Sequence, residues 1–318
     1  MDLYKIKKNT LEPIERESFK LEKNIQSLVE NNIETLFNLE FISTEFSVGD
    51  FRLDSLCYDN VTNSFVVIEY KKGSSYSVID QGYSYMSIML NNKSDFILEY
   101  IEKTGKSLKK SEVDFSQSRI LFISQSFNSY QKNSVNFKDV PFELWEIKKF
   151  SNNTISLNQH LSSSKESIQK IEGNKNSVIK NVGKEIKLYN EEHFTNNLSE
   201  NTLNLWNQLK EKLLEFEDIN FNYTKYYIGF EYNKTKVCGI NFKKNKLDIS
   251  IHRGAISKDN KKSKNFFVLD DPKGVSEDFS WTWKSGTKGH EYWMKYDEKT
   301  NLDYLLFLIK QKYDSLIN

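Results

Sequence analysis

Three ionisable residues with strand-like spacing lie close together in the first third of the chain. Asp54 falls in the run 51–58, and Glu69 and Lys71 fall two residues apart in the run 65–71. Both runs have the apolar, β-branched and aromatic content of strands, and the polar turn between them predicts a hairpin. Because side chains alternate along a strand, Glu69 and Lys71 share one face.

The register of this hairpin decides which side chains meet. Pairing that is symmetric about the turn, with Tyr58 opposite Phe65, places Asp54 opposite Glu69, with Cβ atoms roughly 4.5–5.5 Å apart. Two carboxylates at that distance repel each other unless a cation lies beside them, and Mg²⁺ commonly takes one or two carboxylates plus water and phosphate oxygens. Lys71 would then orient water or stabilise charge on a phosphate. A slip of one residue would move Asp54 to the other face.

An amphipathic helix is predicted upstream, over residues 19–37. Its apolar residues form one stripe at 100° per residue, and Glu22 falls inside that arc beside Val29, whereas Glu30 and Glu34 point outward. A carboxylate in an apolar arc needs a partner. We therefore expect Glu22 either to join the site or to cap the helix or pair with a buried arginine.

The elements around the hairpin predict a mixed α/β domain. Strands are expected at 41–46, 95–101, 119–123 and 142–147, and a helix at 77–90. In that helix Gln81 and Tyr85 are four residues apart and share a face, which suits either contact with the site or, for Tyr85, helix packing.

In this order the residues resemble the PD-(D/E)XK nuclease superfamily, over about residues 10–150. The matching positions are Glu22 in the first helix, Arg52 with Asp54, Glu69 with Lys71, and Gln81 with Tyr85. The first motif lacks a proline before its aspartate, which leaves the subgroup open.

The resemblance implies a restriction-endonuclease-like αβββαβ core in an α+β fold and hydrolysis of phosphodiester bonds with Mg²⁺ or Mn²⁺. It assigns the metal to Asp54 and Glu69, extended by Glu22, and makes Lys71 the catalytic lysine, with Gln81 beside it. Nucleic acid, most simply DNA, is the expected substrate, in a restriction or defence-type role, and a homodimer would suit double-strand cutting. Substrate contacts are expected of Arg52, Tyr85 and Lys72.

Two alternatives stay open at this stage. The hairpin face could carry an ordinary exposed ion pair, which contributes little to stability. The module could also be a catalytically inactive nuclease fold that binds nucleic acid or a protein partner.

Composition excludes several classes of protein. Lys and Arg number 45 against 44 Asp and Glu, so a globally basic polyanion binder is excluded. The two cysteines have no CxxC spacing, which excludes a disulfide framework. No apolar run approaches the roughly 18–20 residues that span a bilayer, and the charged N-terminus lacks a signal-peptide pattern. We expect a cytoplasmic protein without a membrane segment.

The length and a change in composition predict two domains. The nuclease-like domain is expected over residues 1–158, a connector rich in Ser, Lys, Asn and Glu over 159–190, and a smaller α+β accessory domain over 191–318. The last part is expected to contain helices at 198–216 and 301–316 and strands at 225–230, 236–242 and 247–252.

The C-terminal part resembles an uncharacterised domain often fused behind such nuclease modules. The motifs that carry this resemblance are Asp-Asp-Pro-Lys-Gly-Val at 270–275 and Ile-Lys-Gln-Lys-Tyr at 309–313. Trp281, Trp283 and Trp293 stand among lysines, a pattern that suits either stacking of nucleic-acid bases or burial in a core.

Overall fold

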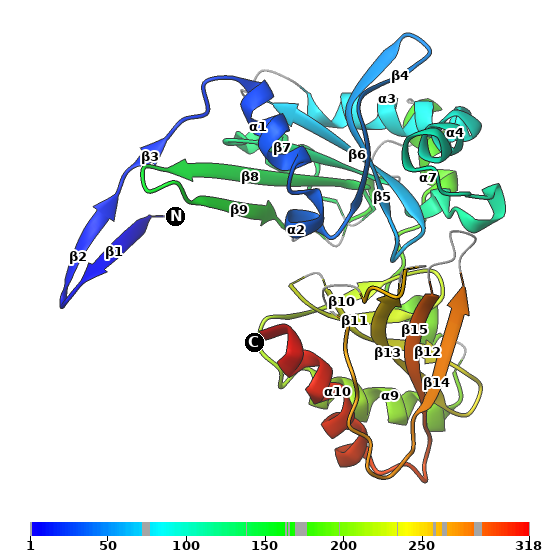
Figure 1. Cartoon of the computed structure of the whole chain (residues 1–318). Helices are drawn as coiled ribbons and strands as arrows, with labels where there is room; N and C mark the ends of the chain where they lie inside the picture. Colours follow the sequence, from blue (N-terminus) through cyan, green and yellow to red (C-terminus); the bar gives the residue numbers. More distant parts are fainter. Residues whose placement is uncertain are drawn as a thin grey trace. The chain divides into compact units, whose positions relative to one another are not determined.

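The computed structural model divides the chain into two compact units, Met1–Leu188 and Tyr189–Asn318 (Figure 1). It describes residues 2–71, 77–137, 139–162, 164, 166–168, 177–196, 198–233, 235–256, 259–262, 266–282 and 288–317.

The first unit contains a seven-stranded mixed sheet. Six of its strands follow the order β3-β8-β7-β6-β5-β4, and the seventh strand, β9, pairs with β8 outside this order. Strands β4, β5 and β6 are antiparallel neighbours, whereas β6, β7 and β8 run parallel. The elements of this unit are β1 (Leu3–Lys7), β2 (Thr10–Ile14), β3 (Arg16–Glu17), α1 (Glu22–Glu30), α2 (Ile33–Phe37), β4 (Glu40–Val48), β5 (Phe51–Asp59), β6 (Ser64–Lys71), α3 (Val78–Asn91), α4 (Lys93–Thr104), the short 3₁₀ helices Lys110–Glu112 and Phe115–Gln117, β7 (Arg119–Ser124), α5 (Ser129–Ser134), β8 (Phe142–Phe150), β9 (Ile155–His160) and α7 (Ser177–Glu185).

Helices cover both faces of the sheet, which explains why every residue of β6 is buried. Val66 and Ile68 face one core with α1 and α2, whereas Phe65 and Val67 face the other core with α3, α4 and α7. Glu69 continues the alternation of Phe65 and Val67 and therefore lies on the α3 side. With α2 and α4 as additional helices, the elements α1, β4, β5, β6, α3 and β7 follow the expected αβββαβ order within an α+β fold.

The strand predicted at 95–101 is wrong, because these residues belong to helix α4. Phe96, Ile97 and Tyr100 are its buried residues, a spacing of one, three and four that fits one face of a helix. Gly105, with φ +67°, ends the helix in the left-handed conformation that glycine adopts without strain.

The single helix predicted over 19–37 is also wrong, since α1 and α2 are separate. Asn31 donates its side-chain amide to the carbonyl oxygen of Ser27 at 2.7 Å, and Asn32 donates to Leu28 at 2.8 Å. Such bonds compete with the helical ladder and favour an end to the helix.

The boundary between the two units differs from the expected one, because part of the segment 159–190 packs on the first unit. Helix α7 contacts α3, and Ile179, Val182 and Ile186 are buried in the first unit's core. This polar segment therefore contains a short amphipathic helix, α7, that packs on the first unit.

The second unit has a six-stranded sheet with the order β10-β11-β12-β13-β15-β14, and α9 and α10 share its hydrophobic core. Its elements are α8 (Glu191–Thr195), α9 (Glu200–Leu213), β10 (Ile219–Tyr223), β11 (Ile228–Tyr232), β12 (Thr235–Phe242), β13 (Leu247–Ile256), β14 (Glu277–Thr282), β15 (Lys288–Tyr296) and α10 (Leu302–Ile317). The expected helices and three strands are confirmed, whereas α8, β10 and β15 were not predicted. Within the described part of the chain, no helix is long and apolar enough to cross a membrane.

Candidate active site

The β5–β6 hairpin has the predicted register. Tyr58 pairs with Phe65 and Leu56 pairs with Val67, and the ladder is antiparallel. The last pair recorded is Ser55 with Ile68, so Asp54 is the next residue beyond the regular ladder. This register brings Asp54 to the level of Glu69 on the neighbouring strand.

The side chain of Asp54 binds the backbone of β6 at the point where the regular strand pairing ends. Its Oδ2 accepts the backbone N–H of Tyr70 at 2.9 Å. Burial raises the pKa of Asp54, while the bond from Tyr70 and the charge of Lys71 act in the opposite direction. The carboxylate is therefore held in place but is costly to ionise without a further cation.

Glu69 is the most deeply placed acid of the group, with 5% of its surface exposed. Its Oε1 accepts hydrogen bonds from Lys71 Nζ at 2.9 Å and from Gln81 Nε2 at 2.7 Å. Its Oε2 is buried and has no hydrogen-bond partner among the described residues. Burial, followed by the charge of Asp54, raises the pKa of Glu69 to about 7.

Helix α3 brings Gln81 and Tyr85 to the same cluster. Gln81 Nε2 also donates to the hydroxyl oxygen of Tyr85 at 2.7 Å, so one amide joins the buried Tyr85 to Glu69. Gly82 permits α3 to lie close to β8, because a Cβ at that position would lie 2.6 Å from the ring of Phe142 on β8. The N-terminus of α3 is capped by Ser77, whose Oγ accepts the backbone N–H of Asp80 at 3.3 Å.

A second polar network, which sequence analysis missed, supports Asp54 from the α1 side of the sheet. Gln26 Nε2 lies 3.2 Å from the carbonyl oxygen of Asp54, 3.1 Å from Thr44 Oγ1 and 3.0 Å from Glu30 Oε1. Glu30 also accepts from Ser55 Oγ at 2.6 Å. The expectation that Glu30 points outward is therefore wrong.

The signal for this network was the position of Gln26, an amide on the apolar stripe of α1. Gln26 is buried beside Ile25 and Val29. A buried amide must find hydrogen-bond partners, and the backbone of β5 supplies one. The hydroxyl oxygen of Tyr70 lies 3.1 Å from Ser55 Oγ and extends the network to β6.

The remaining predicted residues lie less close to the cluster or outside the described residues. Glu22 is the first residue of α1 and is half-buried, and no hydrogen bond or ion pair joins it to Asp54 or Glu69 in the described part of the chain. Arg52 is exposed on β5, with Nη1 3.6 Å from Glu45 Oε2. Lys72 lies outside the described residues.

Asp54 and Glu69 are two carboxylates that could hold a divalent cation. No group of three or more His, Cys, Asp or Glu side chains suited to a metal is present among the described residues. Asp54 and Glu69 would therefore be the protein's side-chain ligands, with the buried Glu69 Oε2 available, and water and phosphate oxygens would complete the shell.

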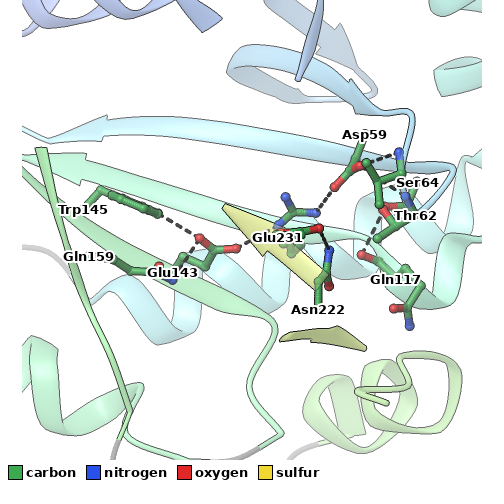
Figure 2. Close-up of polar contacts among 11 residues, drawn as sticks. Asp59, Thr62, Ser64, Gln117, Glu143, Trp145, Gln159, Asn222 and Glu231 are labelled. Carbon is green, nitrogen blue, oxygen red and sulfur yellow. Dashed lines mark hydrogen bonds and ion pairs between the residues drawn. The ribbon is translucent and has the colours of Figure 1, made fainter. Parts of the chain in front are cut away.

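Another charged cluster lies on the same sheet but is fully paired (Figure 2). Arg119 donates through Nη1 to Asp59 Oδ2 at 2.9 Å and through Nε to Glu143 Oε1 at 2.8 Å. Glu143 Oε2 accepts from Trp145 Nε1 at 2.9 Å and from Gln159 Nε2 at 3.1 Å. Although burial alone would lower it, the charges of Asp59 and Glu143 raise the pKa of Arg119. This cluster serves the structure rather than chemistry.

Fold and site together define an α+β protein whose first unit has a mixed sheet with two acidic residues on the neighbouring strands β5 and β6. The chain belongs to the family of a Haemophilus influenzae protein described as uncharacterized, with 36% identity over 315 residues that cover 98% of this chain and 99% of the relative. Residues 190–314 match the family model "Domain of unknown function (DUF5655)".

Two solved structures give weak similarities. A repair endonuclease from Pyrococcus abyssi aligns with a TM-score of 0.25 and 15% identity, over 41% of this chain and 49% of that chain. A complex of EndoMS with double-stranded DNA aligns with a TM-score of 0.27 and 14% identity, over 46% of this chain and 64% of that chain. The match spans about half of the first solved chain and less than two thirds of the second, and neither bears on the chemistry of this chain.

Proposed function

We propose that the first unit is a divalent-metal-dependent nuclease that hydrolyses phosphodiester bonds. The observation that carries the proposal is the convergence of Asp54, Glu69, Lys71 and Gln81, in which the buried Glu69 Oε2 has no partner among the described residues. Two acids with raised pKa values at one strand end favour an added cation, because a cation stabilises their ionised forms.

The cation, Mg²⁺ or Mn²⁺, would act as a Lewis acid on the phosphodiester and make water more acidic. The protein's own part is positioning and charge. Lys71, fixed by its bond to Glu69, places an ammonium where negative charge grows on the phosphate as water adds and the bond to the leaving oxygen breaks. Gln81 holds the orientation of Glu69 through the same oxygen.

DNA is the substrate we propose, with endonucleolytic cleavage in a restriction or defence-type role. The support is the ordered set of motifs at Arg52, Asp54, Glu69, Lys71, Gln81 and Tyr85. The exposed Arg52 on β5 is free to reach a phosphate, since its contact with Glu45 is long and solvent-exposed. Glu22 remains a proposed extension of the metal site, and a homodimer and contacts from Lys72 remain part of the same proposal.

The test is cleavage of DNA and RNA panels by the purified full chain with Mg²⁺, Mn²⁺ or EDTA. Asp54→Asn should abolish turnover and Lys71→Met should reduce it by about 10²–10³-fold, while Asp50→Asn, an exposed acid at the β4–β5 turn, should leave it unchanged. Cleavage that survives both active-site substitutions would contradict the proposal.

Calorimetric titration with Mn²⁺ distinguishes the alternative. Binding of Mn²⁺ that disappears in Asp54→Asn supports the metal site. Binding of nucleic acid without Mn²⁺ uptake or turnover would instead assign the unit to inactive nuclease folds that act as binding modules.

A further inference from the structure

The second unit contains a cavity of about 500 Å³ that the nuclease proposal does not use. It lies among β13, β15, the segment 270–276 and the start of α10, and its volume is in the range of small-molecule sites. The residues that matter for its chemistry are Trp293, Tyr304, Lys273, Lys295, Lys299 and Glu277.

One wall is built by the first of the two motifs that mark this domain. Asp271 accepts Tyr304 Oη–H at 2.6 Å on Oδ1, and on Oδ2 it accepts both the backbone N–H and the hydroxyl of Ser276 at 2.7 Å. Tyr304 Oη in turn accepts the backbone N–H of Lys273 at 3.0 Å, and Lys273 Nζ lies 4.2 Å from the ring centroid of Tyr304. Gly274, with φ +61°, allows the tight turn.

The second motif fixes the same wall from α10. Gln311 accepts the backbone N–H of Asp270 and donates to its carbonyl oxygen, both at 2.9 Å. This bidentate contact ties the segment 270–276 to the helix. The motifs therefore meet in space, and together they hold Lys273 and Tyr304 against the cavity.

The aromatic surface of the opposite wall is also held in a fixed orientation. Trp293 Nε1 donates to Glu291 Oε2 at 3.2 Å, and Glu291 is paired with Lys236 at 3.1 Å. His252 Nδ1 lies 3.8 Å from the same carboxylate. Although burial alone would raise it, His252 and Lys236 lower the pKa of Glu291 to about 2. The half-buried indole is thus anchored by a partly buried, ionised carboxylate.

Cations at the rim of the cavity favour an anionic ligand. Lys246 is neutralised by Asp248 at 2.9 Å, but Lys295 Nζ and Lys299 Nζ have no hydrogen bond or ion pair within the described part of the chain. Three acids also line the cavity: Asp248 pairs with Lys246, and Asp297 accepts the backbone N–H of Lys299 at 3.0 Å and the hydroxyl of Thr300 at 2.9 Å. Glu277 is the third, and as an acceptor it suits a hydroxyl or amino group. The cavity therefore combines an aromatic platform, lysine ammonium groups at its rim and a carboxylate acceptor.

We propose that this cavity binds a nucleoside phosphate, with the base against Trp293 and the phosphate at Lys295 and Lys299. Aromatic rings accept any base by stacking, and ammonium groups bind phosphate as point charges. A free mononucleotide and the unpaired, 5′-phosphorylated end of an oligonucleotide carry the same chemistry. The site lies in the second unit, whereas Asp54 and Glu69 belong to the first, so the proposal does not depend on the proposed nuclease activity.

The test is isothermal titration of the full chain with AMP, GMP, CMP and UMP, with 5′-phosphorylated oligonucleotides and with inorganic phosphate. The double variant Lys295→Gln/Lys299→Gln should weaken binding of the phosphorylated ligands at least tenfold. Lys288→Gln, at the exposed start of the same strand, is the matched control and should leave affinity unchanged. Asp54→Asn should also bind normally, which separates this site from the nuclease proposal.

Each outcome decides the question. Loss of mononucleotide binding in the double variant supports a site for free nucleotides, and loss confined to oligonucleotides supports a site for a strand end. Unchanged affinity in the double variant, no binding of any phosphorylated ligand, or equal binding of inorganic phosphate and nucleotides would overturn the proposal. Circular dichroism checks that the double variant is folded, and both substitutions are at exposed positions.

Discussion

Two clusters in the first unit each combine a pair of carboxylates with one basic side chain, yet they differ in how completely their charges are paired. Around Arg119, recorded bonds reach both Asp59 oxygens and both Glu143 oxygens. Around Lys71, Asp54 and Glu69 have raised pKa values, and Glu69 Oε2 has no partner among the described residues. Both clusters hold one cation and two carboxylates, but among the described residues all four carboxylate oxygens have recorded partners only in the first.

The difference follows from where each cluster sits and from the base that it uses. Arg119 begins β7, and its planar guanidinium reaches β5 and β8 at once. Lys71 ends β6 and offers a compact ammonium that bonds one oxygen of Glu69. Glu69 Oε2 is consequently left without a partner among the described residues, and this is the atom to which the proposed cation would bind.

The largest expected effect separates activity from stability. Lys71→Met should reduce the rate of metal-dependent cleavage by about 10²–10³-fold, the usual cost of removing a group that stabilises transition-state charge. The unfolding free energy should change much less, because Glu69 can take up a proton when its partner is lost. Single-turnover rates and urea denaturation measure the two quantities. A large stability loss with unchanged cleavage would reverse the roles assigned to the clusters.

The opposite result is expected at the paired cluster. Arg119→Met should lower the unfolding free energy by about 3 kcal/mol, because Asp59 and Glu143 would be left without their shared cation. The cleavage rate of the folded fraction should stay within about twofold. Urea titration followed by circular dichroism gives the stability, and Lys132→Met, in the Lys132–Glu146 pair, is a less buried comparison. Equal losses in the two variants would count against a special role for the Arg119 cluster.

The pH dependence of stability should also distinguish the clusters. Because the folded-state pKa of Glu69 is raised from 4.5 to about 7, its contribution is fully present below about pH 4.5 and is lost as the pH rises through 7. In EDTA, Glu69→Gln should remove about 3 kcal/mol of this decline. Thermal melts between pH 4.5 and 8 measure it, and added Mn²⁺ should stabilise the wild type more at the higher pH. Parallel curves for wild type and variant would refute the assignment.

The smallest expected effect concerns support from α1. Gln26→Met removes the amide that bonds the Asp54 carbonyl oxygen and Glu30, and should cost about 1–2 kcal/mol of stability. If Gln26 positions Asp54, the turnover number should fall several-fold while KM stays nearly constant. Steady-state kinetics with a fixed oligonucleotide substrate tests this split. An unchanged turnover number would limit Gln26 to a structural role.

Local pattern predicted the parts of the site that depend on neighbours in sequence. The short turn sets the hairpin register, so the pairing of Tyr58 with Phe65 followed from the sequence, as did the shared helix face of Gln81 and Tyr85. The strand assigned to 95–101 failed because a short apolar run does not distinguish strand from helix until its packing is known.

The orientation of Glu30 could not be predicted for a different reason. Its direction depends on Ser55, which is 25 residues away in sequence, and on the end of α1 at Asn31 and Asn32. Likewise, Glu22 shares the apolar arc of the helix, but the sheet meets α1 one turn later, at Gln26. Helical periodicity identifies a buried face without identifying which residue on it meets a given strand.

Gly82 sets the mechanical tolerance of the proposed active site. An added methyl group there would meet the ring of Phe142 at 2.6 Å, so α3 would have to lift from β8. The same helix carries Gln81, whose amide lies 2.7 Å from Glu69, and an outward shift of about 1 Å would take that bond beyond normal hydrogen-bond length. Gly82 has no side-chain functional group, yet its small size sets the distance between α3 and Glu69.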